Sequence, residues 1–306
     1  MRTLLLATCL LSATASATEV GIRELPCPFG EGNMRVYAKL SANRLGGWDS
    51  DLASYSVGGQ WREYAISTCP SSLYSFPSEA GPSSRLQDPE YRLQLQSLLE
   101  SARTEFGESP ETWEKYEIAI RILFLDEPEP LKIARLYLQA AWTARDRAVD
   151  VYKGLEGPIQ AWQLLESGAV ELEKTTIDPG TRRILHYNLA RIAHRGGFLA
   201  LRNQHLADFH NNGPLQPEET LAAARFQSMV NQVEPIYLAK AALLLEAHIA
   251  STADSQSSCW AHYVRADIAR RAGDLDKARV HYEAVLASAH ADDRIQALTS
   301  WFMERL

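Results

Sequence analysis

The hydrophobic pattern of the chain changes its period near residue 85. Before that point, apolar and polar residues alternate in short stretches, and segment 34–40 has the period of two that is typical of a β-strand. Segment 61–66 predicts a second strand with a less regular alternation. A stretch rich in Ser, Pro and Gly at 77–84 predicts a linker. We therefore expect a small β-containing module with its linker over residues 18–84.

After the linker, apolar residues recur with the period of amphipathic helices. One apolar face is formed by Ile133, Leu136, Tyr137, Ala140, Ala141 and Ala144. Asp178-Pro179 and Ser109-Pro110 each predict a helix start, with a capping residue ahead of a proline at the first helical position. The pattern predicts about eight to ten helices joined by short loops, as in stacked helical hairpins. The predicted fold class is mainly α, with a helical repeat array over residues 85–306.

One unit near the C-terminus has the spacing of a tetratricopeptide (TPR) repeat. Its matching residues are Ala266, Gly273, Ala278, Tyr282 and Val285. Ala266 would allow two helices to approach closely, and Gly273 would end the first of them. Ala278 and Tyr282 would pack the second helix against the first. The match is partial, and at Arg195-Gly196-Gly197 only the helix–Gly–helix rhythm occurs, so we expect a divergent TPR-like array.

The N-terminus has the features of a cleaved signal peptide. Arg2 supplies a positive start, a short apolar run follows, and Ala15-Ser16-Ala17 is an A-x-A cleavage signature. The apolar run is too short to span a bilayer, and no later segment is apolar for long enough. We expect cleavage after Ala17 and a periplasmic protein without a membrane span.

The charge balance argues against nucleic acid as a ligand. The chain has 38 Asp and Glu residues against 31 Lys and Arg residues, a formal net charge of −7. A phosphate-binding surface needs a concentrated basic field instead. The patterns of a nucleophile elbow, a P-loop, a zinc metalloprotease helix and a dinucleotide fold do not occur in the sequence. We therefore expect a binding protein that is not an enzyme and has no cofactor.

Signal cleavage would leave three of the four cysteines. These are Cys27, Cys69 and Cys259. In an oxidising compartment, an odd number predicts one disulfide and one free thiol, or no disulfide. Cys259 stands at an expected helix start, where the helix dipole can favour a thiolate. A packed cysteine in the core of the array is the other interpretation of Cys259.

Two cysteine-containing segments resemble the knuckles of a zinc ribbon. They are Cys27-Pro28-Phe29-Gly30 and Cys69-Pro70-Ser71-Ser72, with the acidic element Asp49-Ser50-Asp51 between them. Together they resemble an uncharacterised bacterial family with paired C-P-x-C knuckles, a D-x-D element and TPR-like helices behind. The helix expected over 131–150, with Trp142 near its middle, suits the first repeat helices of that family. The resemblance covers most of the chain after residue 17 and implies the fold, with a module derived from a zinc ribbon, but no known activity.

The chain departs from the family pattern at the second cysteine of each knuckle. Gly30 and Ser72 stand at those two positions. Tetrahedral zinc needs four ligands, and no histidine precedes His186, so we expect no metal in the module. Because knuckle cysteines lie close together, the resemblance implies a Cys27–Cys69 disulfide in place of zinc. Two buried free thiols are the alternative.

Asp49 and Asp51 have two interpretations. A pair of carboxylates can perform acid–base chemistry or bind a cation. A D-x-D element in a Gly-rich turn can instead cap its own backbone. The residues are therefore candidates either for a functional site or for a structural turn.

The histidines do not show the spacing of a metal site. His186 and His194 are two helical turns apart, too far to share an ion, and His205 and His210 do not share a helix face. We therefore expect no metal ligands among them.

The predicted function is protein or peptide binding by the helical array, as a periplasmic adaptor or scaffold of unknown pathway. Helical arrays bury most of their aromatic residues but also use some of them to bind peptides in concave grooves. The candidates are Trp113, Tyr116, Tyr137, Trp142, Trp162 and Tyr237. Two alternatives remain: a redox- or metal-linked role of the N-terminal module, and an enzyme that uses Asp49 and Asp51.

Overall fold

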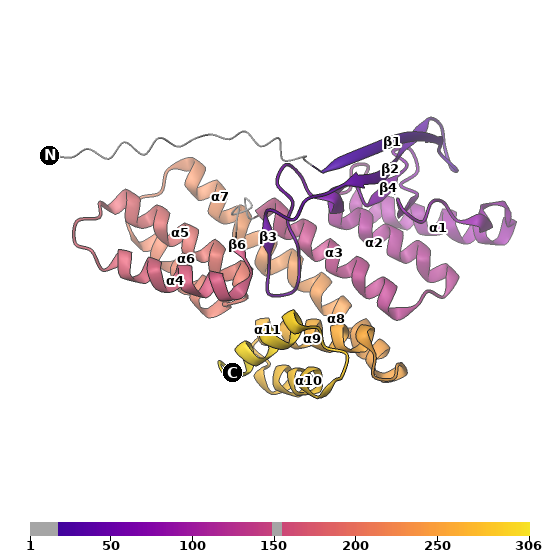
Figure 1. The fold of residues 1–306 in the computed structure, drawn as a ribbon. Coiled ribbons are helices and arrows are strands. Elements are labelled where there is room, and N and C mark those ends of the chain that lie inside the picture. The colour runs from indigo at the N-terminus through magenta and orange to yellow at the C-terminus, as the bar shows by residue number, and fades with distance from the viewer. Residues whose placement is uncertain (1–17, 149–154) are drawn as a thin grey trace.

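The computed structural model describes residues 18–148 and 155–306 (Figure 1). These residues are mainly helical, with short strands near the N-terminus, which confirms the predicted fold class. The expected signal peptide, residues 1–17, lies outside the described residues. Within the described ranges, no helix is both long enough and apolar enough to cross a membrane.

The N-terminal strands form two antiparallel pairs. β1 (Glu19–Pro26) pairs with β2 (Asn33–Ser41), and β4 (Ile66–Thr68) pairs with β5 (Ser75–Pro77). The strand predicted at 34–40 is therefore confirmed, because β2 contains it. Its alternation places Met34 and Val36 in the core and their neighbours at the surface.

The strand predicted at 61–66 is wrong over most of its length. Trp61–Glu63 forms a short 3-10 helix, and β4 begins only at Ile66. Within the 3-10 helix, Arg62 turns inward, and its Nη2 lies 2.6 Å from Oδ1 of Asp146 on a helix. A buried ion pair thus overrides the weak alternation of the segment.

The strands share their hydrophobic core with α1 (Pro89–Phe106) and α2 (Thr112–Leu123). Side chains from both parts fill it, including Met34, Val36, Tyr74, Tyr91, Leu95, Leu99, Ile118 and Ile122. The predicted module boundary at residue 84 therefore does not separate two hydrophobic cores.

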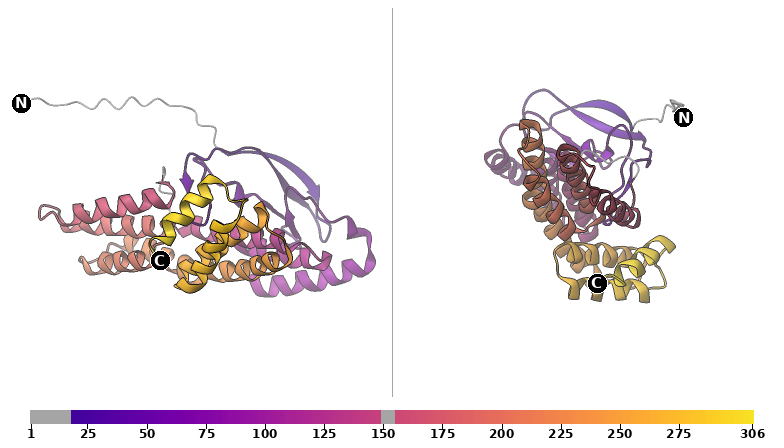
Figure 2. Two further views of the ribbon diagram at one scale, coloured as in Figure 1. Left: turned by 60° about the horizontal axis from the view of Figure 1, so that its bottom comes forward. Right: turned by 90° about the vertical axis from the view of Figure 1, so that its left-hand side faces the viewer.

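The remaining helices surround two long central ones. α3 (Pro130–Ala148) packs along α8 (Glu234–Ser251), with helices α4 to α7 on one side and α9 to α11 below in the view of Figure 1. Figure 2 shows α9 to α11 as a separate layer against this centre. The bounds are α4 Pro158–Leu172, α5 Pro179–Gly196, α6 Leu199–Asn211, α7 Pro217–Ser228, the π-helix Met229–Val233, α9 Gln256–Arg271, α10 Leu275–Ala287 and α11 Asp293–Met303.

One of the two predicted helix starts is confirmed. The Asp178 side chain accepts a hydrogen bond from the backbone of Thr181, and Pro179 opens α5. The other is wrong, because α2 begins two residues after Pro110. There the carboxylate of Glu114 accepts a hydrogen bond from the backbone N–H of Glu111 at 2.7 Å, which closes the first turn.

The residues of the expected repeat unit lie where α9 meets α10. Gly273 has a positive φ of 81° in the turn between the two helices. The other four have no exposed surface and are Ala266, Ala278, Tyr282 and Val285. These two helices are called the α9–α10 hairpin below.

The α5–α6 hairpin, residues 179–211, repeats the α9–α10 hairpin at an offset of 76 residues. Segments 186–205 and 262–281 are identical at nine positions. The pairs are His186/His262, Tyr187/Tyr263, Ala190/Ala266, Ile192/Ile268, Ala193/Ala269, Arg195/Arg271, Gly197/Gly273, Leu199/Leu275 and His205/His281. The chain therefore contains an internal repeat that is stronger than the helix–Gly–helix rhythm expected at Arg195-Gly196-Gly197.

Part of this repeat also occurs in α3. The spacing Tyr-x2-Ala-x4-Arg is found three times in the chain: at Tyr137–Arg145, Tyr187–Arg195 and Tyr263–Arg271. Each occurrence lies on a long helix and ends in an arginine that is buried. The three arginines are therefore equivalent positions of three helices.

Candidate functional site

The segment Asp49-Ser50-Asp51 lies at the centre of the molecule. The loop that carries it runs from β2 toward the helices, and β3 (Gly47–Trp48) pairs there with β6 (Leu155–Glu156) (Figure 1). All three residues have 0% exposed surface. Gly47 has a φ of +78°, and a Cβ at this glycine would lie 1.7 Å from the carbonyl oxygen of Leu155. The close approach of the loop to β6 therefore requires glycine at this position.

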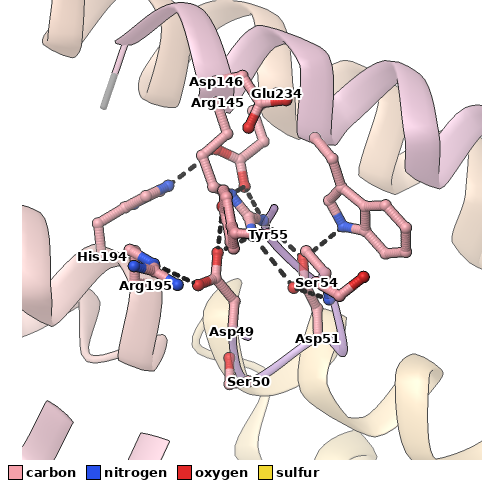
Figure 3. A network of polar contacts seen from close by, with 12 residues as sticks. Asp49, Ser50, Asp51, Ser54, Tyr55, Arg145, Asp146, His194, Arg195 and Glu234 are labelled. Carbon is pink, nitrogen blue, oxygen red and sulfur yellow. Dashed lines mark hydrogen bonds and ion pairs between the residues drawn. The ribbon is translucent and has the colours of Figure 1, made fainter. Parts of the chain in front are cut away.

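The three equivalent arginines converge on this segment, and Figure 3 shows two of them, Arg145 and Arg195. Nη1 of Arg145 lies 2.7 Å from Oδ2 of Asp49, and its Nη2 lies 2.6 Å from Oδ2 of Asp51. Nε of Arg195 lies 2.6 Å from Oδ1 of Asp49. Nη2 of Arg271 donates a hydrogen bond of 2.7 Å to Oγ of Ser50. One short loop thus connects three helices through one repeated arginine.

Two further carboxylates belong to the same network of buried charges. Glu234, the first residue of α8, lies 2.5 Å from Nη2 of Arg145 and 2.9 Å from Nε2 of His194. Asp267 lies 2.8 Å from Nε of Arg271 and accepts a hydrogen bond from the hydroxyl of Ser50. The central ionic network consists of Asp49, Ser50, Asp51, Arg145, His194, Arg195, Glu234, Asp267 and Arg271.

The arginines favour the ionised forms of Asp51 and Glu234. Burial by itself would raise the pKa of Asp51, but the charges of Arg145 and Arg271 hold that pKa well below its usual range. Burial opposes ionisation of Glu234 as well, and Arg145 and His194 more than offset it, which lowers the pKa of Glu234 to about 2. Burial lowers the pKa of His194. The folded state therefore favours the charged forms of Asp51 and Glu234.

Two aromatic side chains donate hydrogen bonds to the carboxylates of the two aspartates. The hydroxyl of Tyr55 donates to Oδ2 of Asp49 at 2.6 Å, and Nε1 of Trp142 donates to Oδ2 of Asp51 at 2.9 Å. The backbone N–H of Ala53 donates to Oδ1 of Asp51 at 3.3 Å, which is a capping contact of the kind that the sequence suggested. The main contacts of both aspartates are nevertheless ion pairs with distant helices.

Cys27 and Cys69 form a disulfide, with their Cα atoms 5.6 Å apart. The N–H of Cys27 donates to the carbonyl of Gly32, and the N–H of Cys69 donates to the carbonyl of Tyr74, so each cysteine opens a tight turn. Cys259 is a buried free thiol whose pKa is raised by burial. The packed interpretation of Cys259 therefore agrees with the structure better than a reactive thiolate.

Two cavities adjoin the central ionic network. The first has a volume of about 550 Å³, and the second has a volume of about 250 Å³. Leu199 and Arg271 line both cavities, so the two cavities lie on either side of these residues. The first is mostly apolar, and its wall includes Trp162, Phe198, Leu201, Leu275 and Phe302. The two cavities together are called the groove.

The second cavity contains a buried arginine with neutral partners. Arg202 is 5% exposed, and its guanidinium donates hydrogen bonds to Asn203 and to Oδ1 of Asn231 at 2.9 Å. No carboxylate of the described residues forms an ion pair with it. Burial lowers the pKa of Arg202. Glu234 lines the same cavity and partly offsets this effect on the pKa from beyond ion-pair distance, so an anionic group in the cavity would supply a direct ion pair.

A group of possible metal ligands lies elsewhere along the contact between α5 and α6. Nδ1 of His186 lies 3.1 Å from Nδ1 of His205, and 3.7 Å from Oδ2 of Asp208. The sequence argument compared histidines along single helices and therefore missed this pairing between two helices.

The remaining predicted aromatic candidates have different positions. Trp162 lines the groove, whereas Tyr116 and Tyr137 are buried in the core. Arg145 and Arg195, which the sequence argument missed, form the main contacts of Asp49 and Asp51, and Glu234, also missed, pairs with Arg145. The repeated Tyr-x2-Ala-x4-Arg spacing is the sequence signal from which the three arginines could have been identified.

Comparisons with family models, curated proteins and solved structures gave no match for this chain. The resemblance to the family with paired knuckles therefore stays a prediction, and a functional proposal depends on the geometry of the groove.

Proposed function

We propose that this chain is a periplasmic peptide-binding adaptor and that its TPR-like helices bind an extended segment of a partner protein in the groove. The segment would carry apolar side chains and a nearby carboxylate, from an acidic residue or from a chain terminus. The observation that carries the proposal is an apolar cavity that shares the lining residues Leu199 and Arg271 with a second cavity, which Arg202 lines.

The shape and chemistry of the groove support this ligand class. The volume of the first cavity lies within the range of about 300–1,000 Å³ that is typical of ligand sites. Its aromatic wall suits apolar side chains, since buried aromatic residues contribute much of the binding energy at protein interfaces. None of the described residues that line this cavity is acidic, while Arg270, Arg271 and Arg305 are among them. A segment with negative charge beside its apolar side chains is complementary to this lining.

The central ionic network supports the proposal by holding the groove in shape. Arg271 belongs to the network and lines both cavities. His194 and Glu234 belong to the network and line the second. Because these side chains are fixed by ion pairs, the peptide would bind a preformed surface, which lowers the entropic cost of binding.

The alternatives have less support. Asp49 and Asp51 have no exposed surface, which does not favour contact with a substrate. Cys69 has no exposed surface either, and Cys27 is 9% exposed, which does not favour exchange of the disulfide with an external thiol.

Selection from a peptide display library tests the proposal directly. The immobilised chain from Thr18 to Leu306 should enrich peptides that combine apolar residues with a carboxylate. The affinity of a selected peptide, measured by fluorescence anisotropy, should fall at least tenfold in Arg202→Met, which keeps an unbranched apolar stem and removes the charged guanidinium. Conversion of the peptide carboxylate to an amide should have a similar effect.

Arg279→Met is the matched control, because Arg279 is exposed on α10 and does not line the groove. This variant changes the net charge equally and should leave the affinity unchanged. Failure of the folded protein to enrich any peptide consensus would contradict the proposal. Equal binding by wild type and Arg202→Met would contradict it as well.

A further inference from the structure

We propose that the α5–α6 hairpin holds a divalent transition-metal ion between His186, His205 and Asp208. The candidate ligand atoms of these three residues all lie within 4.8 Å of one another. The Nδ1 atoms of the two histidines are 3.1 Å apart. Two nitrogen ligands at about 2.0–2.1 Å from one tetrahedral ion are separated by roughly 3.3 Å, so only a small adjustment is needed.

The helices place the three ligands together. His205 and Asp208 are three residues apart on α6, which puts both side chains on one face of the helix. His186 faces them from α5, and the short turn after Gly196 holds the two helices against each other. The site therefore combines a pair on one helix with a third ligand from its neighbour, an arrangement that the sequence spacing alone does not reveal.

The environment suits metal binding at neutral pH. His186 and His205 are 8% and 9% exposed, and burial lowers the pKa of both imidazoles. Neutral imidazole is the form that binds metal, and the two facing Nδ1 atoms leave room for a single proton, which an ion would replace. The side chain of Asp208 is 40% exposed, so solvent has access to a further coordination position.

The repeat contains a natural comparison for this site. In the α9–α10 hairpin, the equivalent pair His262 and His281 also has its Nδ1 atoms close together, at 3.0 Å. The position equivalent to Asp208 is Ala284, so the third ligand is missing there. The histidine pair is thus a shared feature of the two hairpins, and Asp208 is the residue that distinguishes them. We assign the metal site to the α5–α6 hairpin alone.

The ligand set indicates the class of metal. Imidazole nitrogens suit Zn²⁺, Cu²⁺ and Ni²⁺, and one carboxylate is compatible with each of them. The bound ion would link α5 to α6, the two helices that supply His194 and Arg202 to the groove, with Phe198 in the turn between them. Its expected role is to stabilise this hairpin.

Zn²⁺ titration tests the assignment. The untagged chain from Thr18 to Leu306, stripped with a chelator, should bind one Zn²⁺ ion in isothermal titration calorimetry. Asp208→Asn and His205→Ala should each weaken the binding at least tenfold, whereas His281→Ala should leave the affinity unchanged. Co²⁺ should give the visible absorption of a tetrahedral site, and Asp208→Asn should alter that spectrum.

A variant that gains a site makes the test stricter. Ala284→Asp supplies the missing third ligand in the α9–α10 hairpin and should raise the stoichiometry from one Zn²⁺ ion to two. Circular dichroism of the metal-free variants checks that each one is folded. If His205→Ala does not fold, Asp208→Asn still decides the question, because the Asp208 side chain is partly exposed. Wild-type protein that binds no Zn²⁺ at micromolar concentration would overturn the proposal, as would binding that survives Asp208→Asn.

Discussion

The α5–α6 and α9–α10 hairpins share a sequence pattern and differ in how they balance its charges. In α9, Asp267 forms ion pairs with both Arg270 and Arg271 of the same helix. In α5, the position of Asp267 is occupied by Arg191, so Arg195 depends on Asp49 from the N-terminal loop. The α9–α10 hairpin supplies its own carboxylate, whereas the α5–α6 hairpin depends on other parts of the chain.

The positions at which the two hairpins differ include two of the proposed binding residues. Most of the identical residues pack the two helices or bind the central loop, and the histidine pair is common to both hairpins. Arg202 of the groove has Ala278 as its counterpart, and Asp208 of the proposed metal site has Ala284. Both proposed binding groups thus occur where the α9–α10 hairpin has alanine. Two hairpins with the same packing pattern can therefore differ in function. The α5–α6 hairpin has the proposed binding residues, and the α9–α10 hairpin has alanine at those positions.

The largest expected effect comes from the equivalent arginines. Arg195→Met should destabilise the protein by about 3–5 kcal/mol, because the change removes one of the cations that offset the buried charge of Asp49. Arg271→Met should cost less, since Asp267 keeps its ion pair with Arg270 and Asp51 keeps its direct ion pair with Arg145. Urea unfolding of both variants measures the loss of unfolding free energy in each. Equal losses would contradict the difference between the two hairpins.

The disulfide provides a test outside both hairpins. The double variant Cys27→Ser, Cys69→Ser opens a loop of 42 residues and should cost about 4 kcal/mol in the chain-entropy model. The hairpins should keep their affinity for Zn²⁺ and for peptide once the variant is folded. Alkylation of the unfolded wild type without reductant should label a single thiol, Cys259, and labelling of three would contradict the disulfide.

Acid should weaken the contact between α8 and the α5–α6 hairpin. Folding lowers the pKa of Glu234 from 4.5 to about 2, so the folded state favours the ionised carboxylate. This stabilisation is complete above pH 4.5 and is lost as the pH falls toward 2, on the order of 3 kcal/mol in total. Asp51 contributes in the same direction. The unfolding free energies of wild type and Glu234→Gln should differ most at pH 7 and become more similar at pH 4 and pH 3. A difference that stays constant with pH would contradict this explanation.

The smallest expected effect on stability belongs to Arg202. Arg202→Ala makes this position equal to Ala278 of the other hairpin and should change stability by no more than about 1 kcal/mol, because no ion pair is broken. The affinity for a selected peptide should nevertheless fall at least tenfold, equivalent to about 1.4 kcal/mol. Thermal melting and anisotropy of the same variant separate the two effects. A large loss of stability would show that Arg202 is a structural residue.

Local sequence signals predicted local structure well where no distant contact opposed them. The alternation at 34–40 predicted β2, and Asp178-Pro179 predicted the start of α5. The signal at 61–66 failed because Arg62 forms an ion pair with Asp146, which is 84 residues away. Strand preference is weak in a short segment, and a buried ion pair outweighs it.

The residue pattern along the chain specifies the helical class, because helix period, capping and turn residues act over a few neighbouring positions, and it contains the nine identities of the repeat. The role of Asp49 and Asp51 depends instead on how the helices pack. Their partners Arg145 and Arg195 lie 94 to 146 residues away, and the packing of α3 and α5 brings them to the loop. The same reason applies to the groove and to His186 with His205, since residues from separate helices become neighbours only after the helices pack.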